Sequence, residues 1–191
     1  GRQFQQRQLG QLAGQVAKAR DNIRQRLKDY ELLSADDQDR ATLKAVRDGA
    51  TLVVADPRAI WLTKLAKRHL QLRPGSDVWL LNAIMHVILE EGLQDDDYIA
   101  AHCEDFESVR EVVSRYTPED AERVTGVAAE AIRATAREYA TERHAAIFYT
   151  LGITEHACGV DNVWSLANLV LMTGHLGYES TGLNALRGQN N

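Results

Sequence analysis

Two acidic residues stand at positions where the chain pattern favours ligand binding. Asp56 directly follows Thr51-Leu52-Val53-Val54-Ala55, a β-prone run typical of a buried strand, and Asp77 ends the loop Arg73-Pro74-Gly75-Ser76-Asp77 ahead of a helical pattern. Ligands of α/β proteins bind just outside the carboxyl ends of strands, and the free amides of a first helical turn favour an anion. Ser76 or Asp77 can equally be a plain cap of that helix. Asp56 and Asp77 are therefore the first candidates for a ligand site.

A second strand end gives a second candidate region. The run Ala145-Ala146-Ile147-Phe148-Tyr149 predicts another strand, and the segment Leu151-Gly152-Ile153-Thr154-Glu155-His156 follows it directly. This turn has the same relation to its strand as Asp56 has to residues 51–55, so it is again where ligands are expected.

Histidine, cysteine and tryptophan residues give weaker signals. Cys103 and Cys158 belong to no CxxC unit, so no zinc knuckle or iron–sulfur loop is predicted and each is interpreted as a reduced core thiol. His86, on an apolar helix pattern, is interpreted as a hydrogen-bonded core histidine. His102 beside Cys103, and His156 near Cys158, lack the four spaced ligands of a structural zinc site. The residues expected to be core anchors are Trp61, Trp79 and Trp164.

The elements that position these residues alternate between strand and helix patterns. We therefore predict an α/β fold, with a Rossmann-like parallel sheet flanked by helices and preceded by a long amphipathic N-terminal helix. The loop 174–188 fits no regular element. Strands are expected at 51–55, 69–72 and 145–149, and helices at 59–67, 80–91, 95–101, 106–116, 118–124, 128–140 and 162–173, with Thr117 capping the helix that starts at Pro118.

The first 41 residues form a separate segment. Residues 5–30 show the three- and four-residue apolar spacing of one amphipathic helix, which packs either on its own domain or on a partner. Ser34 and the aspartates after it predict the start of a second helix, which Gly49 ends. We expect a helical segment over 1–41, an α/β domain over 42–191, and chain ends that are cuts within a longer protein.

Composition narrows the class of protein. The formal charge of −5 and the pI near 5.7 disfavour nucleic acid as a partner, because phosphate binding needs a concentrated basic face. The sequence contains no run of 18 apolar residues and no secretory leader, so we expect a cytoplasmic protein without a membrane segment. Neither a GxGxxG motif after a strand nor a P-loop is present, which argues against a plain NAD-binding domain.

Eight short motifs occur in one fixed order along residues 42–191. Each alone is weak, because such strings arise by chance, but the ordered set is highly specific. The motifs are Ala50-Thr51-Leu52-Val53-Val54-Ala55-Asp56-Pro57-Arg58, Leu72-Arg73-Pro74-Gly75-Ser76-Asp77 with Leu80-Leu81-Asn82-Ala83, His86-Val87-Ile88 with Glu90-Glu91-Gly92-Leu93, Tyr116-Thr117-Pro118-Glu119, Thr125-Gly126-Val127, Leu151-Gly152-Ile153-Thr154, Leu171-Met172-Thr173-Gly174 and Leu186-Arg187-Gly188-Gln189-Asn190-Asn191. Together they closely resemble the central region of formate dehydrogenase alpha subunits, in the molybdopterin oxidoreductase family. Residues 1–41 show no such resemblance.

The resemblance implies a bis-molybdopterin guanine dinucleotide cofactor carrying molybdenum or tungsten. A carboxylate can accept both the N1–H and the exocyclic amine of guanine, so Asp56 and Asp77 suit the nucleotide end of one cofactor. Arg58 or Arg73 would then be available to its phosphates.

The turn after the strand at 145–149 is implied to meet the pterin or its pyrophosphate. Gly152 permits this approach because it has no side chain to collide with the ligand. Glu155 stands where the family usually has Gln, and a carboxylate beside a polyanionic cofactor is repelled unless it is protonated or paired. The expected cofactor-binding residues are Asp56, Arg58, Arg73, Gly75, Asp77, Gly152, Thr154 and Glu155.

The closing motif supplies the expected catalytic residues. The planar fork of Arg187 can hold a carboxylate such as formate by two charge-assisted hydrogen bonds, and Gln189 would orient the anion or the pterin. The reaction implied is the two-electron oxidation of formate to carbon dioxide, with other redox subunits as partners. A [4Fe–4S] cluster and the metal-ligating residue would belong to the parent protein, so we expect this chain alone to be inactive.

Two alternatives stay open. The chain could be a non-catalytic remnant or interaction module of the family, in which residues 1–41 form a helical arm that binds a partner. It could also derive from a family member that acts on another oxyanion or on an N-oxide.

Overall fold

The computed structural model describes residues 42–186, and the chain divides into two compact units, 1–50 and 51–191. In the first unit, residues 42–47 are helical, with an ion pair of 2.9 Å between Lys44 and Asp48. Gly49 follows with a φ of +104°, so the predicted helix end is confirmed. The predicted helix over 5–30 and the cap at Ser34 lie outside the described residues.

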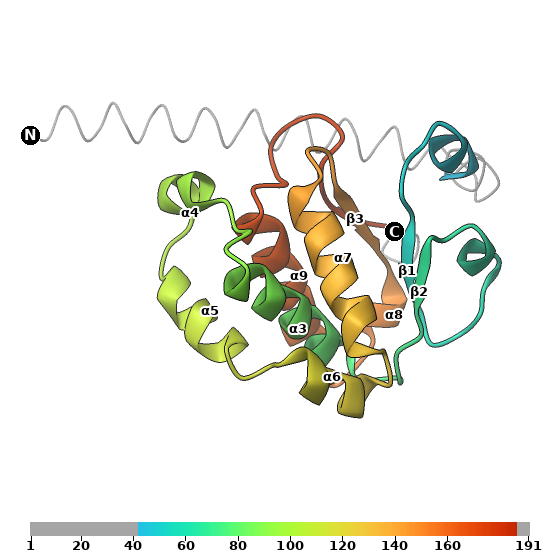
Figure 1. Cartoon of the computed structure of the whole chain (residues 1–191), viewed down its shortest axis with the longest axis horizontal. Helices are drawn as coiled ribbons and strands as arrows, with labels where there is room; N and C mark the ends of the chain where they lie inside the picture. Colours follow the sequence, from blue (N-terminus) through green and yellow to red (C-terminus); the bar gives the residue numbers. More distant parts are fainter. Residues whose placement is uncertain (1–41, 187–191) are drawn as a thin grey trace, which may run out of the picture. The chain divides into compact units, whose positions relative to one another are not determined.

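The second unit is built around helix α3 (Asp77–Glu90), which packs against α5 (Phe106–Val113), α6 (Pro118–Thr125), α7 (Ala129–Thr141) and α9 (Gly159–Met172). Figure 1 shows α3, α7 and α9 side by side. Apolar residues recur on α3 at three- and four-residue spacing, so most of its turns contribute to the core. The core cluster includes Leu80, Ile84, Val87, Ile88, Val113, Ala121, Ile132, Ala136, Leu169 and Met172.

Two helix starts follow the sequence signals closely. Helix α6 begins at Pro118, and the Thr117 hydroxyl accepts a hydrogen bond of 3.2 Å from the Asp120 amide. Helix α4 (Asp96–His102) begins after Asp95, whose side chain accepts a hydrogen bond of 2.8 Å from the Tyr98 amide. These caps satisfy amides that have no partner within the helix. None of the helices within 42–186 has the length and apolar character needed to span a bilayer.

The strands form two separate parallel ladders. Strand β1 (Val53–Ala55) pairs with β2 (Arg68–Leu70), and β3 (Ala146–Tyr149) pairs with β4 (Gly182–Ala185). The α/β class is confirmed, whereas the single Rossmann-like sheet is not formed within residues 42–186.

Strand details differ from the sequence prediction in two ways. Residues 51–55 are not buried on both faces, because Val54 alone is buried in β1. Strand β4 falls in the loop that the sequence left unplaced, since Gly-Leu-Asn-Ala lacks the β-branched residues typical of strands. Strand β4 is stabilised by its pairing with β3 and not by strand propensity. The side-chain amide of Asn184 adds a 3.3 Å hydrogen bond to the Ile147 carbonyl.

Several predicted core residues are more exposed than expected. Trp61 lies in a short 3₁₀ helix, η1 (Trp61–Lys64), rather than in an α-helix over 59–67, and its exposed fraction is 40%. Trp164 is 64% exposed, so both predictions of a core anchor were wrong, while Trp79 packs edge-on against Tyr116. The thiols, Cys103 and Cys158, are unpaired but only half-buried.

The prediction for His86 is confirmed. Its Nδ1 lies 3.2 Å from the Val113 carbonyl oxygen, and the side chain is largely buried between α3 and α5.

A close junction joins α8 (Leu151–Thr154), a single helical turn after β3, to the first turn of α9. A Cβ on Gly159 would lie 2.1 Å from the Thr154 carbonyl oxygen, so only glycine fits this position without movement. The fully buried Asn162 donates a 2.7 Å hydrogen bond to the Ile153 carbonyl, and its amide oxygen lies 3.8 Å from the Cys158 sulfur. These contacts fix the turn after β3 to the core helix α9.

An ionic cluster joins β2 to α7. Arg68 donates a 2.6 Å hydrogen bond to Glu138, and Lys67 donates a second to the same carboxylate. These two hydrogen bonds, of which that from Arg68 has the larger effect, lower the pKa of Glu138 from 4.5 to about 2.

The α8–α9 junction makes a first prediction about stability. Replacing Gly159→Ala should destabilise the chain by about 1–3 kcal/mol, because the new methyl group collides with a backbone oxygen. Gly152→Ala is a matched control seven residues away in the sequence, since a Cβ there meets nothing within 4 Å. Urea unfolding of both variants tests this expectation. Equal destabilisation by the two substitutions would contradict the tight junction.

The ionic cluster makes a prediction about pH. A carboxyl whose folded-state pKa is depressed adds stability above its unfolded pKa, and this contribution is lost as the pH falls through the folded pKa. The free energy of unfolding of the wild type should therefore exceed that of Glu138→Gln by about 1–2 kcal/mol near pH 6. This amount already includes a reduction for screening of the charges by solvent. This difference should shrink between pH 5 and pH 2 in urea titrations. A difference that stays constant with pH would exclude the ion pairs as its source.

Candidate cofactor-binding site

The carboxyl end of β1 is organised around Asp56. The Arg58 amide donates a 2.7 Å hydrogen bond to Asp56 Oδ1, and the Arg58 side chain forms an ion pair of 3.3 Å with the same oxygen. Partial burial acts to raise the pKa of Asp56, but the hydrogen bonds from Arg58 outweigh it and hold the pKa below its ordinary value. Asp56 is therefore ionised at neutral pH, and its charge is partly balanced by an exposed arginine.

The side chains of His69 in β2 and of Gln71 just after it hold the backbone of this strand end. His69 Nε2 lies 2.8 Å from the Asp56 carbonyl oxygen, and the Gln71 amide donates a 3.0 Å hydrogen bond to the Pro57 carbonyl. The parallel pairing of β1 with β2 places these residues next to each other. In the turn Asp56-Pro57-Arg58, two backbone carbonyls are thus bonded by side chains of the β2 segment, and the Asp56 carboxylate is directed to Arg58.

Arg73 is committed to a structural contact. Its guanidinium donates hydrogen bonds of 2.7 and 2.9 Å to the carbonyls of Arg123 and Val124, in the last turn of α6. Its backbone amide also bonds the Thr125 carbonyl, and Gly126 ends the helix with a φ of +81°. Arg73 thereby satisfies carbonyls that lack helical partners and complements the negative end of the helix. Both bonds use one nitrogen, Nη1, of a residue that is exposed overall.

The loop before α3 leaves the start of that helix without a side-chain cap. Of the two caps predicted for α3, Ser76 and Asp77, Ser76 occupies the N-cap position, but its hydroxyl donates a 2.6 Å hydrogen bond to the Arg73 carbonyl and accepts none from the helix. Asp77 is the first helical residue rather than the cap. Gly75 precedes them with a φ of +82°, a conformation that glycine adopts without strain, and a Cβ there would meet nothing within 4 Å. The start of α3 is therefore approachable along its backbone.

The structure brings Asp77 and the turn after β3 together. His156 Nε2 lies 3.9 Å from Asp77 Oδ2, and the side chains are 28% and 17% exposed. The start of α3 and the segment 151–156 are thus adjacent although they are far apart in sequence. This pairing joins two of the regions that the sequence singled out. Asp56, by contrast, bonds to Arg58 through its carboxylate and to His69 of β2 through its backbone carbonyl.

The turn itself is α8, and it is accessible. Gly152 is exposed with open space around it, and the Thr154 hydroxyl donates a weak 3.4 Å hydrogen bond to the Leu151 carbonyl. Glu155 is exposed, and its backbone amide closes the turn onto Leu151. Solvent can therefore screen the charge of Glu155, which weakens the repulsion expected beside an anionic ligand.

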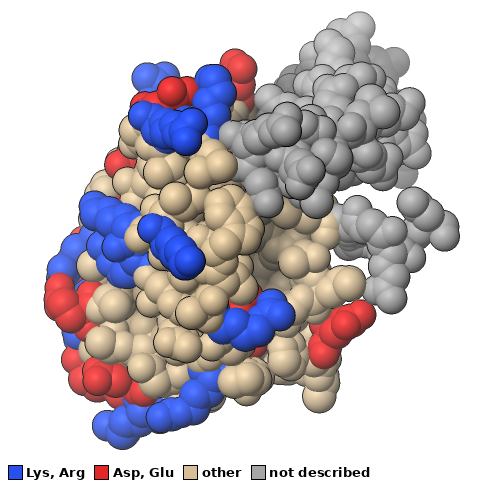
Figure 2. Space-filling view, turned by 90° about the vertical axis from the view of Figure 1, so that its right-hand side faces the viewer, with Lys and Arg blue, Asp and Glu red and all other residues tan. Residues whose placement is uncertain are grey.

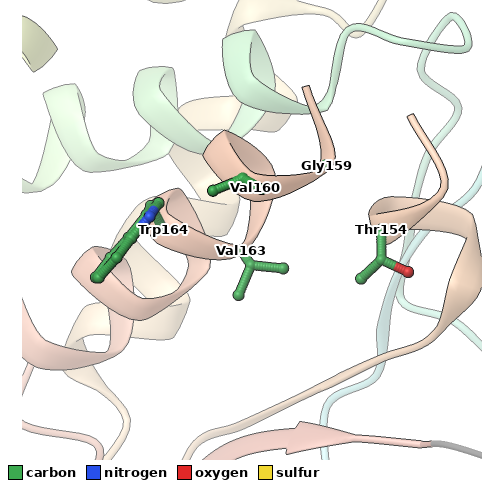
Figure 3. A pocket seen from close by; sticks show the side chains of 5 residues that line it. All are labelled: Thr154, Gly159, Val160, Val163 and Trp164. Carbon is green, nitrogen blue, oxygen red and sulfur yellow. The ribbon is translucent and has the colours of Figure 1, made fainter. Parts of the chain in front are cut away.

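A shallow hollow of about 300 Å³ lies between this turn and α9. It is lined by Thr154 of α8 and by Gly159, Val160, Val163 and Trp164 of α9. Figure 3 shows Thr154 on one side of the opening, across from the side chains that project from α9. The lining is almost entirely apolar, so this hollow does not offer the charged partners that a phosphate or a carboxylate needs.

Three residues of the site were missed or given another role by sequence reasoning. His156 follows the predicted turn, but nothing in the sequence connects it with Asp77. The helix was predicted to start at Asn162, whereas α9 begins at Gly159. Gly159 was assigned no role, although a glycine in a first helical turn is a signal of close backbone approach. Arg187 and Gln189 lie outside the described residues. Within residues 42–186, no group of three or more His, Cys, Asp or Glu side chains is arranged to hold a metal ion.

The charged side chains on one face of the molecule are dispersed. Figure 2 looks onto the right-hand side of Figure 1 and shows Lys, Arg, Asp and Glu side chains interspersed, with an uncharged area between them. An anion on this face would meet individual basic side chains rather than a continuous basic patch.

Comparisons with known proteins agree on one family. The family model for molybdopterin oxidoreductase matches residues 34–191. The chain is 46% identical over 149 residues to formate dehydrogenase H of Escherichia coli, covering 78% of this chain and 21% of that protein. It is 43% identical over 152 residues to the alpha subunit of F420-dependent formate dehydrogenase 2 of Methanococcus maripaludis, covering 80% and 22%. The assimilatory nitrate reductase catalytic subunit of Bacillus subtilis is 32% identical over 148 residues, covering 78% and 21%.

A solved structure shares the fold. Acetylene hydratase from Pelobacter acetylenicus matches with a TM-score of 0.73 and 27% identity, over 75% of this chain and 20% of that chain. The chain thus spans about a fifth of the length of these relatives. The extent of the family match and the identities to full-length relatives show that the chain belongs to the molybdopterin oxidoreductase family.

Proposed function

We propose that this chain is part of the catalytic subunit of a molybdopterin-dependent formate dehydrogenase, in which it contributes to the pocket of a bis-molybdopterin guanine dinucleotide. The observation that carries the proposal is the difference in identity between relatives. Formate dehydrogenases are 41–46% identical to this chain, whereas the matching nitrate reductases are 31–32% identical over similar lengths. The proposal includes partner redox subunits, a [4Fe–4S] cluster in the longer protein and a cytoplasmic location.

The chemistry of the described residues fits a dinucleotide. Support for a guanine role of Asp77 comes from its position at the first turn of α3, beside amides that carry no side-chain cap. The base can bond to the carboxylate while a phosphate meets the amides or a basic side chain. Gly75 and Gly152 leave open space at the two adjacent segments, as a ligand that contacts the backbone requires. His156, close to Asp77, is a further candidate donor to a phosphate.

The arginines divide into two roles in this proposal. Arg58 is exposed and pairs with Asp56 over long hydrogen bonds, of 3.3 and 3.4 Å, so it can turn to a phosphate at small cost. Arg73 holds the end of α6 through its Nη1, and only its remaining donors are available to a ligand. We therefore propose Arg58 as the phosphate partner in preference to Arg73.

The Rossmann-like sheet belongs to the same proposal. Parallel sheets are usually covered on both faces and extend over more than two strands. The ladders β1–β2 and β3–β4 would then be parts of larger sheets that the remaining four-fifths of a full-length subunit completes.

The proposed substrate step rests on the closing motif. Arg187 binds the formate carboxylate through the two parallel donors of its guanidinium, and Gln189 orients the anion. Formate then loses two electrons and one proton to become carbon dioxide. When bound, the cofactor supplies the two-electron acceptor. The residues of this chain bind and orient, and the relatives' greater length leaves room for the metal-ligating residue elsewhere.

Arg187 provides the test of this function. In the full-length natural protein, Arg187→Lys should lower kcat/KM for formate by about 10- to 100-fold, because lysine keeps the charge but loses one charge-assisted hydrogen bond worth about 1.5–3 kcal/mol. The same exchange at Arg115, which is exposed and pairs with Glu111 of α5, is the matched control and should leave the rate unchanged. Formate-dependent reduction of a viologen dye measures both.

The same assay separates the alternatives. Wild-type activity with nitrate but not with formate would support the reading that the substrate is another oxyanion. No turnover of either substrate by a cofactor-loaded protein would favour a non-catalytic module, and normal formate oxidation by Arg187→Lys would remove Arg187 from substrate binding.

A further inference from the structure

Helix α9 has apolar side chains both on the side that meets the core and at two exposed positions near its start. Leu166, Leu169 and Val170 are buried on the side that meets the core. On the other side, Val160 and Trp164 are 71% and 64% exposed and lie one turn apart. Large apolar side chains that lie next to each other in water commonly mark a contact surface. The first turns of α9 therefore expose an apolar area beside the polar Asp161.

The exposed side adjoins the hollow between α8 and α9. Val160, Val163 and Trp164 form one wall, here named the α9 patch, and Thr154 lies opposite. The single hydroxyl in the lining already bonds to the backbone of its own turn, and no charged side chain takes part. A volume of about 300 Å³ suits one or two apolar side chains, whereas a nucleotide or a formate ion would find no polar partner there.

We propose that the α9 patch is a docking surface for polypeptide of the same subunit that lies outside these 191 residues. The relatives in which this region is embedded are four to five times as long as the matched part, since the match covers 20–23% of their length. An apolar surface of this kind inside a long chain is covered by the chain itself, because an exposed tryptophan and valine stay in contact with water at a cost. The occupant is an apolar segment that places a side chain in the hollow against Trp164.

This docking has a consequence for the cofactor site. Thr154 lines the hollow and Gly152 belongs to the same turn, so an occupant of the hollow would contact the turn that the cofactor proposal uses. The proposal rests on membership of the family and not on formate as the substrate. Its outcome can therefore be read independently of the activity assay.

Hydroxyl-radical footprinting with mass spectrometry tests the proposal directly. The oxidation rate of Trp164 is compared between the 191-residue chain and the full-length natural protein. The rate should fall by about fivefold or more in the longer protein, because a side chain that is 64% exposed becomes enclosed. An equal rate in the two proteins, or a natural gene product that ends at Asn191, would overturn the proposal.

Two further outcomes identify other occupants. Protection of Trp164 that grows with concentration in the 191-residue chain would mean a second copy of the chain. Protection in the longer protein that appears only after cofactor loading would mean that the cofactor fills the hollow. Either result would overturn the assignment to the subunit's own polypeptide.

A substitution gives an independent readout with opposite expectations for the two proteins. Trp164→Glu should leave the Tm of the 191-residue chain nearly unchanged, because the side chain is exposed there. In the longer protein it should lower the Tm by several degrees, because a carboxylate would be buried without a partner. Asp161→Asn, an exposed polar exchange in the same turn of α9, is the matched control and should change neither. Equal effects of Trp164→Glu in the two proteins would contradict the docking surface.

Discussion

The contact between the Thr154 carbonyl and Gly159 is the constraint on which the candidate site depends. A side chain at residue 159 would overlap that oxygen. The buried Asn162 holds the same turn through a hydrogen bond to the carbonyl of the preceding residue, Ile153. Because α9 packs in the core beside α3, the turn after β3 is brought to the start of α3. The adjacency of Asp77 and His156 is thus a consequence of core packing and does not need the ligand.

The site is assembled from segments with different degrees of freedom. Arg73 and Ser76 use their side chains to fix the loop before α3, which leaves the helix amides uncapped. Asp56 is fixed by its own arginine and by β2. The uncapped amides at the start of α3 are therefore held in place by Arg73 and Ser76, whose side chains are already hydrogen-bonded to backbone carbonyls.

Local signals in the sequence were enough for most helices and for the strand ends. Thr117 with Pro118, and Gly49 and Gly92 after helices, act through backbone geometry within a few residues, so the sequence reveals them. Strand β4 and the pair Asp77–His156 depend on contacts between distant segments, and no local pattern encodes them. Trp164 was misassigned for a physical reason as well. Its apolar neighbours on α9 indicate burial, and within residues 42–186 nothing covers it.

The family motifs supplied what local physics did not. Arg187 and Gln189 stand out only through the ordered motif set, because an isolated arginine near a chain end is ordinarily solvated. The structure adds information that the motifs do not contain, because it distinguishes the two arginines. Arg58 is exposed and its hydrogen bonds are long, whereas Arg73 is hydrogen-bonded to carbonyls at the end of α6. Sequence resemblance and geometry therefore restrict different parts of the same site.

The most direct test of the central claim is the cofactor content of the full-length natural protein. Pterin fluorescence after oxidation, guanine nucleotide released by hydrolysis, and molybdenum or tungsten by elemental analysis are measured per mole of protein. The account predicts pterin and guanine nucleotide in equal amounts together with the metal, and a lower content of all three in Asp77→Asn but not in the exposed control Asp97→Asn. A protein without pterin, or an Asp77→Asn variant with undiminished pterin and nucleotide, would contradict it.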